Sequence, residues 1–439
     1  MSDTHANTVA FVRETQIPQS PPPATERGIV KWLRENMFSS VLNSILSLLS
    51  IFFIFMLIKD LGPWFWNSTW NAENLAECRE LNSGACFAVI NERWPQFFFG
   101  FYPAEERWRP VLAFLLLFPA LAPVLFDKAP RALLVVTLLF PFVAYWLIWG
   151  GSIAFPLAVL LGFVLAFVIW KALAKTQPTI ALIVSVLVLV LYQLVVGGAG
   201  LVENILMGIL GNPEDGPALL AFEEVESRNI GGFLLTLILG ITSISLALPI
   251  GILLALGRQS DLIIIKYICV GFIEFIRGVP LITLLFVANV LLAYFLPPGT
   301  TFDLILRVVI MVTAFAAAYL AEVVRGGLAA LPRGQYEAAD SLGLDYWQAM
   351  QLIILPQALK ISIPGIVNVF IGLFKDTVLV SIISMYDPLG IVQPILADSD
   401  WNGILWELYG FVALFFFIFC YAMSQYSRYL EQKLRTDHR

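Results

Sequence analysis

Three consecutive polar residues, Lys375, Asp376 and Thr377, interrupt the otherwise apolar stretch of residues 361 to 385. An ionised side chain at bilayer depth costs at least about 2.5 kcal/mol, so we expect these side chains to face protein or water. A lysine donates hydrogen bonds and an aspartate accepts them, so the segment could hold a small molecule that carries both charges. A local salt bridge between Lys375 and Asp376 fits the same residues.

Two further pairs of opposite charge lie within apolar stretches. Glu274 and Arg277 are three residues apart, and so are Glu322 and Arg325. This spacing places two side chains on one face of a helix, where opposite charges pair. We therefore predict two intramembrane ion pairs that hold spans together, the second near the cytoplasmic end.

The sequence lacks the residues that several other kinds of chemistry require. The two histidines, His5 and His438, lie near the ends of the chain, which argues against a histidine proton relay or a metal site. No Gly-x4-Gly-Lys-Ser/Thr loop is present to hold the phosphates of ATP. Cys78 and Cys86 lie between apolar runs, where an oxidising compartment would allow a bridge, and two free thiols are the alternative. We predict neither a metal nor a cofactor in this chain.

The elements that position these residues are transmembrane helices. Hydrophobic residues make up 59% of the 439 residues and charged residues 13%, against roughly half and a quarter in soluble domains. A helix needs about 20 apolar residues to cross the hydrocarbon core. We predict an all-α polytopic membrane protein with about ten transmembrane helices, which excludes a soluble enzyme. The formal net charge of -6 shows no basic footprint for nucleic acid. The apolar runs cover residues 38–58, 111–126, 132–149, 152–170, 179–197, 230–257, 267–296, 304–324, 361–385 and 404–424.

The distribution of lysine and arginine predicts the orientation in the membrane. Lys31 and Arg34 precede the first apolar run, and every second connection after it is basic. Because cytoplasmic loops carry the positive excess, we expect both termini in the cytoplasm. The first run is long enough to span and has no clear small-residue cleavage site, so we expect it to be retained as an anchor.

This pattern divides the chain into five parts. The first is expected to be disordered because it combines prolines with polar residues. The parts are a cytoplasmic tail at 1–37, a transmembrane extension at 38–200 with an external loop at 59–110, an external acidic loop at 201–229, a transmembrane domain at 230–430 with a cytoplasmic loop at 334–356, and a cytoplasmic tail at 431–439.

The cytoplasmic loop carries the most specific motif in the chain. We expect Gly343 to end a short helix, because glycine readily takes the left-handed conformation, and a second short helix to follow over residues 346 to 352. Pro356, which lacks a backbone N–H, is expected to stop that helix and turn the chain toward the bilayer. The motif consists of Glu337, Ala338, Ala339, Gly343, Ile353, Leu355 and Pro356, with three residues before the glycine and nine after it.

This motif resembles, at every position, the cytoplasmic loop signature of binding-protein-dependent ABC permeases. Residues 274 to 280 and 319 to 335 are similar to the polar amino acid permeases of the histidine/glutamine type. The likeness covers about residues 228 to 432. The long first half resembles more loosely the M-type permease subunits of general L-amino acid importers.

The resemblance implies a five-helix type I ABC importer core in the C-terminal half. The chain would form the pathway for L-amino acids across the bacterial inner membrane, while a separate subunit binds and hydrolyses ATP. The loop at 334–356 would be a coupling helix docked in the ATPase subunit, and Asn368, Lys375, Asp376 and Thr377 would line the substrate route. The implied partners are ABC ATPase subunits, a second permease in a heterodimer, a periplasmic amino-acid-binding protein, the L-amino acid and membrane lipid.

Three other function classes remain alternatives at this point. An ion-coupled secondary amino acid transporter also uses buried charges and broken helices, and Pro249, Pro280 and Pro364 interrupt spans here. A membrane-embedded enzyme would need a metal cluster or a Ser/His arrangement, and a scaffold would need neither. The loop motif argues against all three, and copurification of an ATPase would separate them from the ABC permease.

Overall fold

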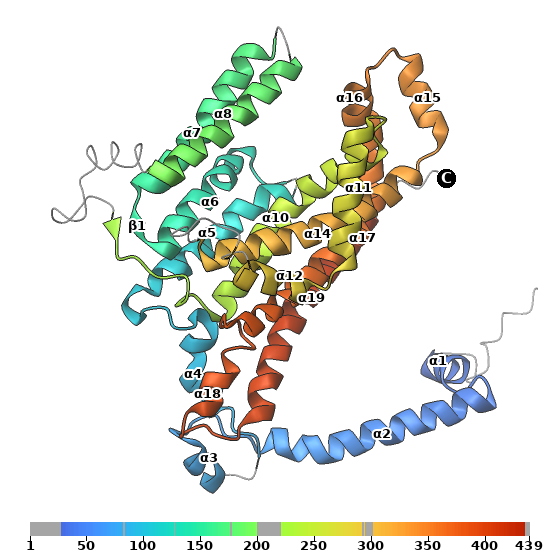
Figure 1. The fold of residues 1–439 in the computed structure, drawn as a ribbon. Coiled ribbons are helices and arrows are strands. Elements are labelled where there is room, and N and C mark those ends of the chain that lie inside the picture. The colour runs from blue at the N-terminus through green and yellow to red at the C-terminus, as the bar shows by residue number, and fades with distance from the viewer. Residues whose placement is uncertain are drawn as a thin grey trace, which may run out of the picture. The chain divides into compact units, whose positions relative to one another are not determined.

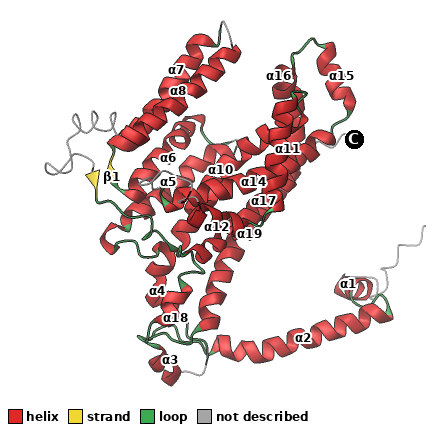
Figure 2. Ribbon diagram, in the orientation of Figure 1, coloured by secondary structure: helices red, strands yellow, loops and turns green. Residues whose placement is uncertain are grey.

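The computed structural model describes residues 28–81, 84–126, 128–175, 178–199, 221–291, 294 and 302–434. The described chain is almost entirely helical (Figure 2). It separates into two compact units, Met1–Thr69 with Arg79–Cys86, and Trp70–Cys78 with Phe87–Arg439. Most of the predicted tail at 1–37 and most of the acidic loop at 201–229 lie outside the described residues.

The first unit contains the helices α1 (Gly28–Asn36) and α2 (Val41–Trp66). Ser40 caps the start of α2, because its hydroxyl accepts a hydrogen bond from the Asn43 backbone N–H at 3.1 Å. Helix α2 corresponds to the predicted first span and continues beyond it to Trp66. The described end of the predicted tail at 1–37 is helical, since α1 lies within it.

After α2, the predicted transmembrane extension at 38–200 continues with short helices and then with long apolar helices. Most of the predicted external loop at 59–110 is helical, and the helices α7 and α8 pack side by side (Figure 1). A small antiparallel ladder joins β1 (Gly151–Ser152) to β2 (Ala221–Phe222). The helices of this part are α3 (Leu75–Leu81), α4 (Ala88–Phe99), η2 (Ala104–Glu106), α5 (Trp108–Leu125), η3 (Arg131–Leu133), α6 (Leu134–Trp149), α7 (Ala154–Leu173) and α8 (Pro178–Ala199).

The C-terminal half packs around the pair α10 and α14. Gly251 of α10 lies so close to Leu320 that a Cβ added there would approach the Leu320 Cβ to 2.7 Å, so a glycine permits this helix contact. The helices of this half are α10 (Gly232–Gln259), α11 (Ile263–Gly278), α12 (Leu281–Phe286), η5 (Val287–Leu291), α14 (Leu304–Ala329), α15 (Arg333–Ser341), α16 (Tyr346–Ala349), η6 (Met350–Ile354), α17 (Leu355–Asp376), η7 (Thr377–Ile383), α18 (Val392–Ala397) and α19 (Leu405–Leu434).

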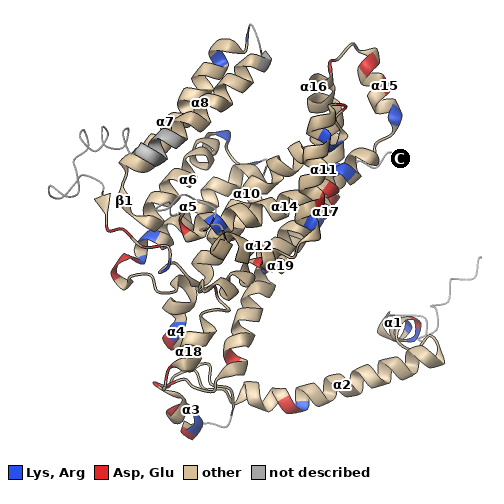
Figure 3. Ribbon diagram, in the orientation of Figure 1, with Lys and Arg blue, Asp and Glu red and all other residues tan. Residues whose placement is uncertain are grey.

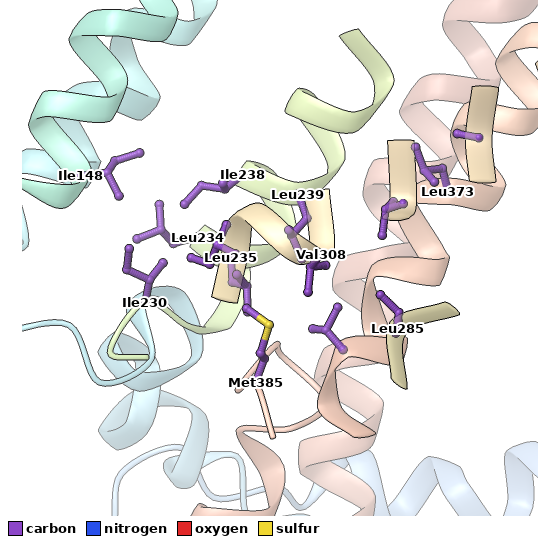
Figure 4. Packing of buried hydrophobic residues seen from close by; sticks show 14 of the residues in the cluster. Ile148, Ile230, Leu234, Leu235, Ile238, Leu239, Leu285, Val308, Leu373 and Met385 are labelled. Atoms are coloured by element: carbon purple, nitrogen blue, oxygen red, sulfur yellow. The ribbon is translucent and has the colours of Figure 1, made fainter. Parts of the chain in front are cut away.

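The apolar core of this half lies where α10, α14 and the end of α17 meet. Leu235 and Leu239 of α10 are fully buried and lie beside Val308 of α14 (Figure 4). Leu373 and Met385 belong to the same buried cluster. Burying a leucine side chain of this kind contributes about 1.5 to 3 kcal/mol in water, and in lipid the gain comes from close packing instead. This core fixes the helices that carry the predicted sites.

Eight helices of the described residues are long and apolar enough to cross a membrane, and the bent pair α11 and α12 makes nine if it is one span. The prediction of an all-α polytopic membrane protein is confirmed, with eight to nine spans in place of ten. The run that does not qualify is the fifth, at 179–197: it falls in α8, whose described apolar part, Ile180–Gln193, is shorter than the other spans.

The prolines within the core have two different effects. Helices α11 and α12 meet at an angle of 102°, and the break falls at Val279 and Pro280. Pro280 precedes the first residue of α12, where a missing N–H costs nothing. Pro249 and Pro364 instead lie inside α10 and α17, which continue through them.

Candidate functional site

The predicted coupling loop folds into two short helices that meet at Gly343. Gly343 has φ 70°, which is left-handed. Its N–H donates to the Asp340 carbonyl at 2.9 Å, and the Leu344 N–H donates to the Ala339 carbonyl at 3.3 Å. These two bonds form a Schellman motif, which satisfies the last carbonyls of α15. The glycine therefore ends the helix in the way its position predicts.

A capping box starts the second helix of the loop. The Asp345 carboxylate accepts from the Gln348 N–H at 2.8 Å, and the Gln348 side-chain oxygen accepts from the Asp345 N–H at 3.2 Å. Each side chain satisfies one free donor of the first turn. Helix α16 therefore begins at Tyr346, as predicted.

The expectation that Pro356 stops this helix is wrong. The chain runs through the π-turn η6 directly into α17, in which Pro356 occupies the first turn. The Leu355 N–H donates to the Met350 carbonyl, five residues back. A wider π-turn next to the proline relieves the clash that a proline ring makes with the preceding turn of an α-helix. Residues Tyr346–Ile383 thus form one long apolar helical stretch.

The predicted coupling segment, residues 334–356, has an inner and an outer face. On the inner face, Ala339, Met350 and Ile354 are buried, and the latter two pack in a cluster with the ends of α10 and α14. On the outer face, Leu342 is 72% exposed and Leu352 is 69% exposed. Helices α15 and α16 lie beyond one end of α17 (Figure 1). Large exposed apolar side chains of this kind are typical of a surface that contacts protein or membrane.

The residues of the coupling motif divide between these two faces. Within the described part of the chain, four of them are exposed and one is fully buried, and the remaining two are half-buried against the cluster. The exposed residues are Glu337, Ala338, Gly343 and Pro356, the buried one is Ala339, and the half-buried ones are Ile353 and Leu355.

The charges of α11 and α14 meet in one network around Glu322. Its Oε2 lies 3.0 Å from Nη2 of Arg325 and 3.7 Å from Nη1 of Arg277. Glu274 lies 3.9 Å from Arg277, which is a loose contact. Figure 3 shows acidic and basic positions side by side beside the labels of α11 and α17. The structure therefore places both predicted pairs in a single cluster.

Sequence reasoning missed the residue that joins this network. Arg258, at the end of α10, places its Nη1 2.7 Å from Glu322 and 2.9 Å from Glu274. The ion pairs predicted from the sequence do not include Arg258. The two carboxylates face three arginines, so the cluster has an excess positive charge, and Arg277 also lies over the Tyr319 ring at 5.6 Å. The sequence has no local pattern that would predict an ion pair between Arg258 and residues so far from it in the chain.

The four residues of the predicted substrate route lie in the second half of α17 and at the first residue of η7, and they differ in exposure. Asn368 and Lys375 are exposed, and their spacing of seven places them on one helix face. Asp376 is half-buried. Thr377 is fully buried, and its hydroxyl donates to the Phe374 carbonyl at 2.8 Å. No ion pair between Lys375 and Asp376 occurs in the described chain, so the alternative of a local salt bridge gains no support.

The cysteines fall into two classes. Cys78 and Cys86 are both buried and both disulfide-bonded. Cys269 of α11 and Cys420 of α19 are free. Across the described ranges, no cluster of three or more His, Cys, Asp or Glu side chains could hold a metal ion.

Comparison with known proteins identifies the family. Residues 227–436 match the model of the binding-protein-dependent transport system inner membrane component. The chain is 54% identical, over 100% of both sequences, to the glutamate/glutamine/aspartate/asparagine transport system permease protein BztC of Rhodobacter capsulatus. It is 39% identical to the inner membrane amino-acid ABC transporter permease protein YhdY of Escherichia coli, over 95% of this chain and 96% of that protein.

A solved structure is similar over less than half of the chain. A crystal structure of an amino acid ABC transporter with histidines is 30% identical, with a TM-score of 0.40, and covers 46% of this chain and 91% of that chain. The chain belongs to the family of amino-acid permeases in binding-protein-dependent ABC importers. It is thus a multi-pass inner-membrane transport component and not an enzyme, which confirms the function predicted from the loop motif.

Proposed function

We propose that this chain, together with a second permease subunit, forms the route by which glutamate, glutamine, aspartate and asparagine enter the cell. The observation that carries the substrate class is the 54% identity, over the full length of both chains, to a permease named for these four amino acids. All four are zwitterions, so a route for them needs donors for a carboxylate and acceptors for an ammonium.

The exposed face of α17 supports a route shared with a second subunit. Asn368 and Lys375 lie on this face, within the apolar stretch Tyr346–Ile383. A lysine at this depth cannot face hydrocarbon without a cost of at least about 2.5 kcal/mol. In the assembled transporter this face is therefore covered by protein or water, and a second permease subunit, in a heterodimer, supplies that cover. Lys375 then meets the carboxylate of the substrate and Asp376 meets its ammonium.

The outer face of α15 and α16 supports coupling to a separate ATPase. Trp347 is 60% exposed there, beside the exposed Leu342 and Leu352. Large apolar side chains on short helices fit a hydrophobic groove of a partner. Because the inner face of the same segment packs on the ends of α10, α14 and α17, a movement of the ATPase subunits acts directly on the spans. With this coupling, we expect α15, α16 and both termini of the chain on the cytoplasmic side.

Reconstitution in liposomes tests this proposal. The chain is combined with its neighbouring permease, ATPase and binding protein, and the uptake of labelled amino acids is measured with and without ATP. We expect ATP-dependent uptake of the two acidic amino acids and their amides, and little uptake of lysine or leucine. Uptake that follows a proton or sodium gradient and ignores ATP would contradict the proposal.

A further inference from the structure

A surface cavity of about 520 Å³ lies beside α4 in the part of the chain that precedes the permease core. No residue of the predicted coupling or substrate sites lines it. Two arginines and one glutamate contribute its charges, and Phe101 and Tyr102 contribute apolar surface. The polar residues of its lining are Glu92, Arg93, Gln96 and Arg107.

The two arginines of this cavity have unused hydrogen-bonding capacity. The Nε atoms of Arg93 and Arg107 are both buried and make no hydrogen bond. Arg93 already pairs with Asp398 at 2.5 Å. Arg107 has no carboxylate partner within the described ranges, because the neighbouring Glu106 pairs with Arg109 at 2.9 Å. Arg107 is therefore the cation of this cavity that a partner from outside can neutralise.

The cavity is attached rigidly to the permease core. The Phe101 N–H donates to the Asn229 carbonyl at 3.1 Å, and Gly100 forms an antiparallel bridge with Ile230, just before α10. Gly100 has φ 66°, and a Cβ there would lie 2.5 Å from the Gly231 Cα, so this crossing of two chain segments requires glycine. The Phe101 ring packs edge-on against Tyr386, which follows α17 and η7, at 5.0 Å.

We propose that this cavity receives an acidic side chain of the periplasmic binding protein, with Arg107 as its ion-pair partner. Phe101, which is 44% exposed, supplies the apolar contact at the edge of the cavity. Arginine and aromatic residues are the types enriched in protein interfaces, and a bidentate arginine selects a carboxylate by geometry. The inference rests on the proposed function, since it requires a binding protein and an external position of residues 87 to 110.

The favoured source of the carboxylate is a protein side chain rather than a free amino acid. Glu92 is exposed and also lines the neighbouring cavity. The cavity beside α4 is therefore open on this side and does not enclose a small ligand. The cavity therefore offers one unpaired cation with an exposed aromatic ring beside it. This arrangement suits a side chain that is held in place by a wider interface.

Titration of the assembled transporter with its binding protein tests the proposal. The whole complex is placed in nanodiscs, and ATP hydrolysis is measured against the concentration of glutamate-loaded binding protein. We expect Arg107→Glu to raise the half-saturating concentration by roughly tenfold or more, because close charge pairs across an interface contribute at least about 1.5 kcal/mol. The maximal rate should not change, because Arg107 touches neither the substrate route nor the coupling segment.

A matched control lies on the same side of the chain. Arg228 is exposed and lies outside the cavity, so Arg228→Glu makes the same charge change without altering the cavity. Arg107→Ala provides a second variant should the reversed charge impair assembly, and it should raise the half-saturating concentration by a smaller factor. Equal effects of Arg107→Glu and Arg228→Glu would overturn the proposal, as would a lower maximal rate with an unchanged half-saturating concentration.

Two further outcomes separate this inference from the proposed function. Stimulation of ATP hydrolysis by free glutamate alone that is lost in Arg107→Ala would overturn the proposal in favour of a small-molecule site. A wild-type complex that the binding protein does not stimulate at all would contradict the proposed function itself, whatever residue stands at position 107.

Discussion

Arg258 and Glu322 are separated by 64 positions in the chain, yet Nη1 of Arg258 donates a hydrogen bond to Oε1 of Glu322 at 2.7 Å. The same nitrogen donates to Oε1 of Glu274 at 2.9 Å. One guanidinium therefore connects α10, α11 and α14. The ends of these three helices adjoin the buried cluster beneath the coupling segment, so the network fixes the helices on which that segment rests.

We predict that Arg258→Gln destabilises the permease. Hydrogen bonds to charged groups contribute about 1.5 to 3 kcal/mol each, and the substitution leaves Glu322 with Arg325 and Glu274 with only the loose contact to Arg277. The midpoint of thermal unfolding, measured on the purified complex in nanodiscs, should fall by several degrees. Lys266→Gln is the matched control, because Lys266 is exposed on α11. Equal midpoints for the two variants would show that the network contributes no net stability.

A second prediction concerns the exposed face of the coupling segment. Leu342 is 72% exposed, so Leu342→Asp should leave the fold of the permease intact. If this side chain fills a groove of the ATPase, a charge in its place should weaken ATPase binding by roughly tenfold or more, because truncated anchor residues cost at least about 2 kcal/mol. Copurification of the ATPase and ATP-driven uptake are the measurements.

The control for this experiment keeps the apolar contact. Leu342→Met should retain ATPase binding and uptake, since methionine has a similar volume and no charge. Full copurification and uptake in Leu342→Asp would show that the ATPase contacts the permease elsewhere. Loss of folding in that variant, seen as aggregation in detergent, would contradict the exposed position of this side chain.

A third prediction concerns the substrate route at the end of α17. Asp376→Asn removes the negative charge that we assign to the substrate ammonium. Uptake should fall by roughly tenfold or more, since a hydrogen bond to a charged group contributes about 1.5 to 3 kcal/mol. Asp340→Asn makes the same change on the exposed surface of α15 and should have no such effect. Unaltered uptake and selectivity in Asp376→Asn would remove this residue from the route.

The sequence predicts those features that depend on neighbouring residues. Gly343 ends α15 because the glycine and the residues around it form the whole motif, and the capping box of α16 is equally local. Arg258 shows the limit, because its partners Glu274 and Glu322 approach it only after the helices pack. Pro356 shows a second limit of prediction from the sequence. The wide π-turn that accommodates this proline has no recognisable pattern of residue types.

The last prediction concerns Asp387, which lies after η7 and outside the spans. Its side chain is fully buried, and the carboxylate accepts from the Leu389 N–H at 3.1 Å and the Gly390 N–H at 2.9 Å. Burial raises its pKa from 3.8 to about 7, and the backbone hydrogen bonds offset only part of that rise. Asp387 therefore takes up a proton in the folded protein at a pH where the unfolded chain has already lost it.

The sign of the resulting pH dependence follows from the bound protons. Between the unfolded pKa of 3.8 and the folded pKa of about 7, the folded state holds one proton more than the unfolded state, so stability falls as the pH rises through this window. The full shift corresponds to roughly 4 kcal/mol as an upper limit. Asp387→Asn cannot ionise and keeps a side-chain oxygen as acceptor for one backbone N–H. Its unfolding midpoint should therefore vary less with pH than that of the wild type.

Thermal unfolding of the purified complex at a series of pH values across this window measures the difference. The comparison between variants isolates Asp387, because every other titrating group is common to both. Asp400→Asn serves as the control, since Asp400 is exposed in the loop before α19 and should leave the wild-type pH dependence in place. Parallel curves for the wild type and Asp387→Asn would mean that Asp387 is already ionised in the folded protein, and that water or a partner subunit reaches its carboxylate.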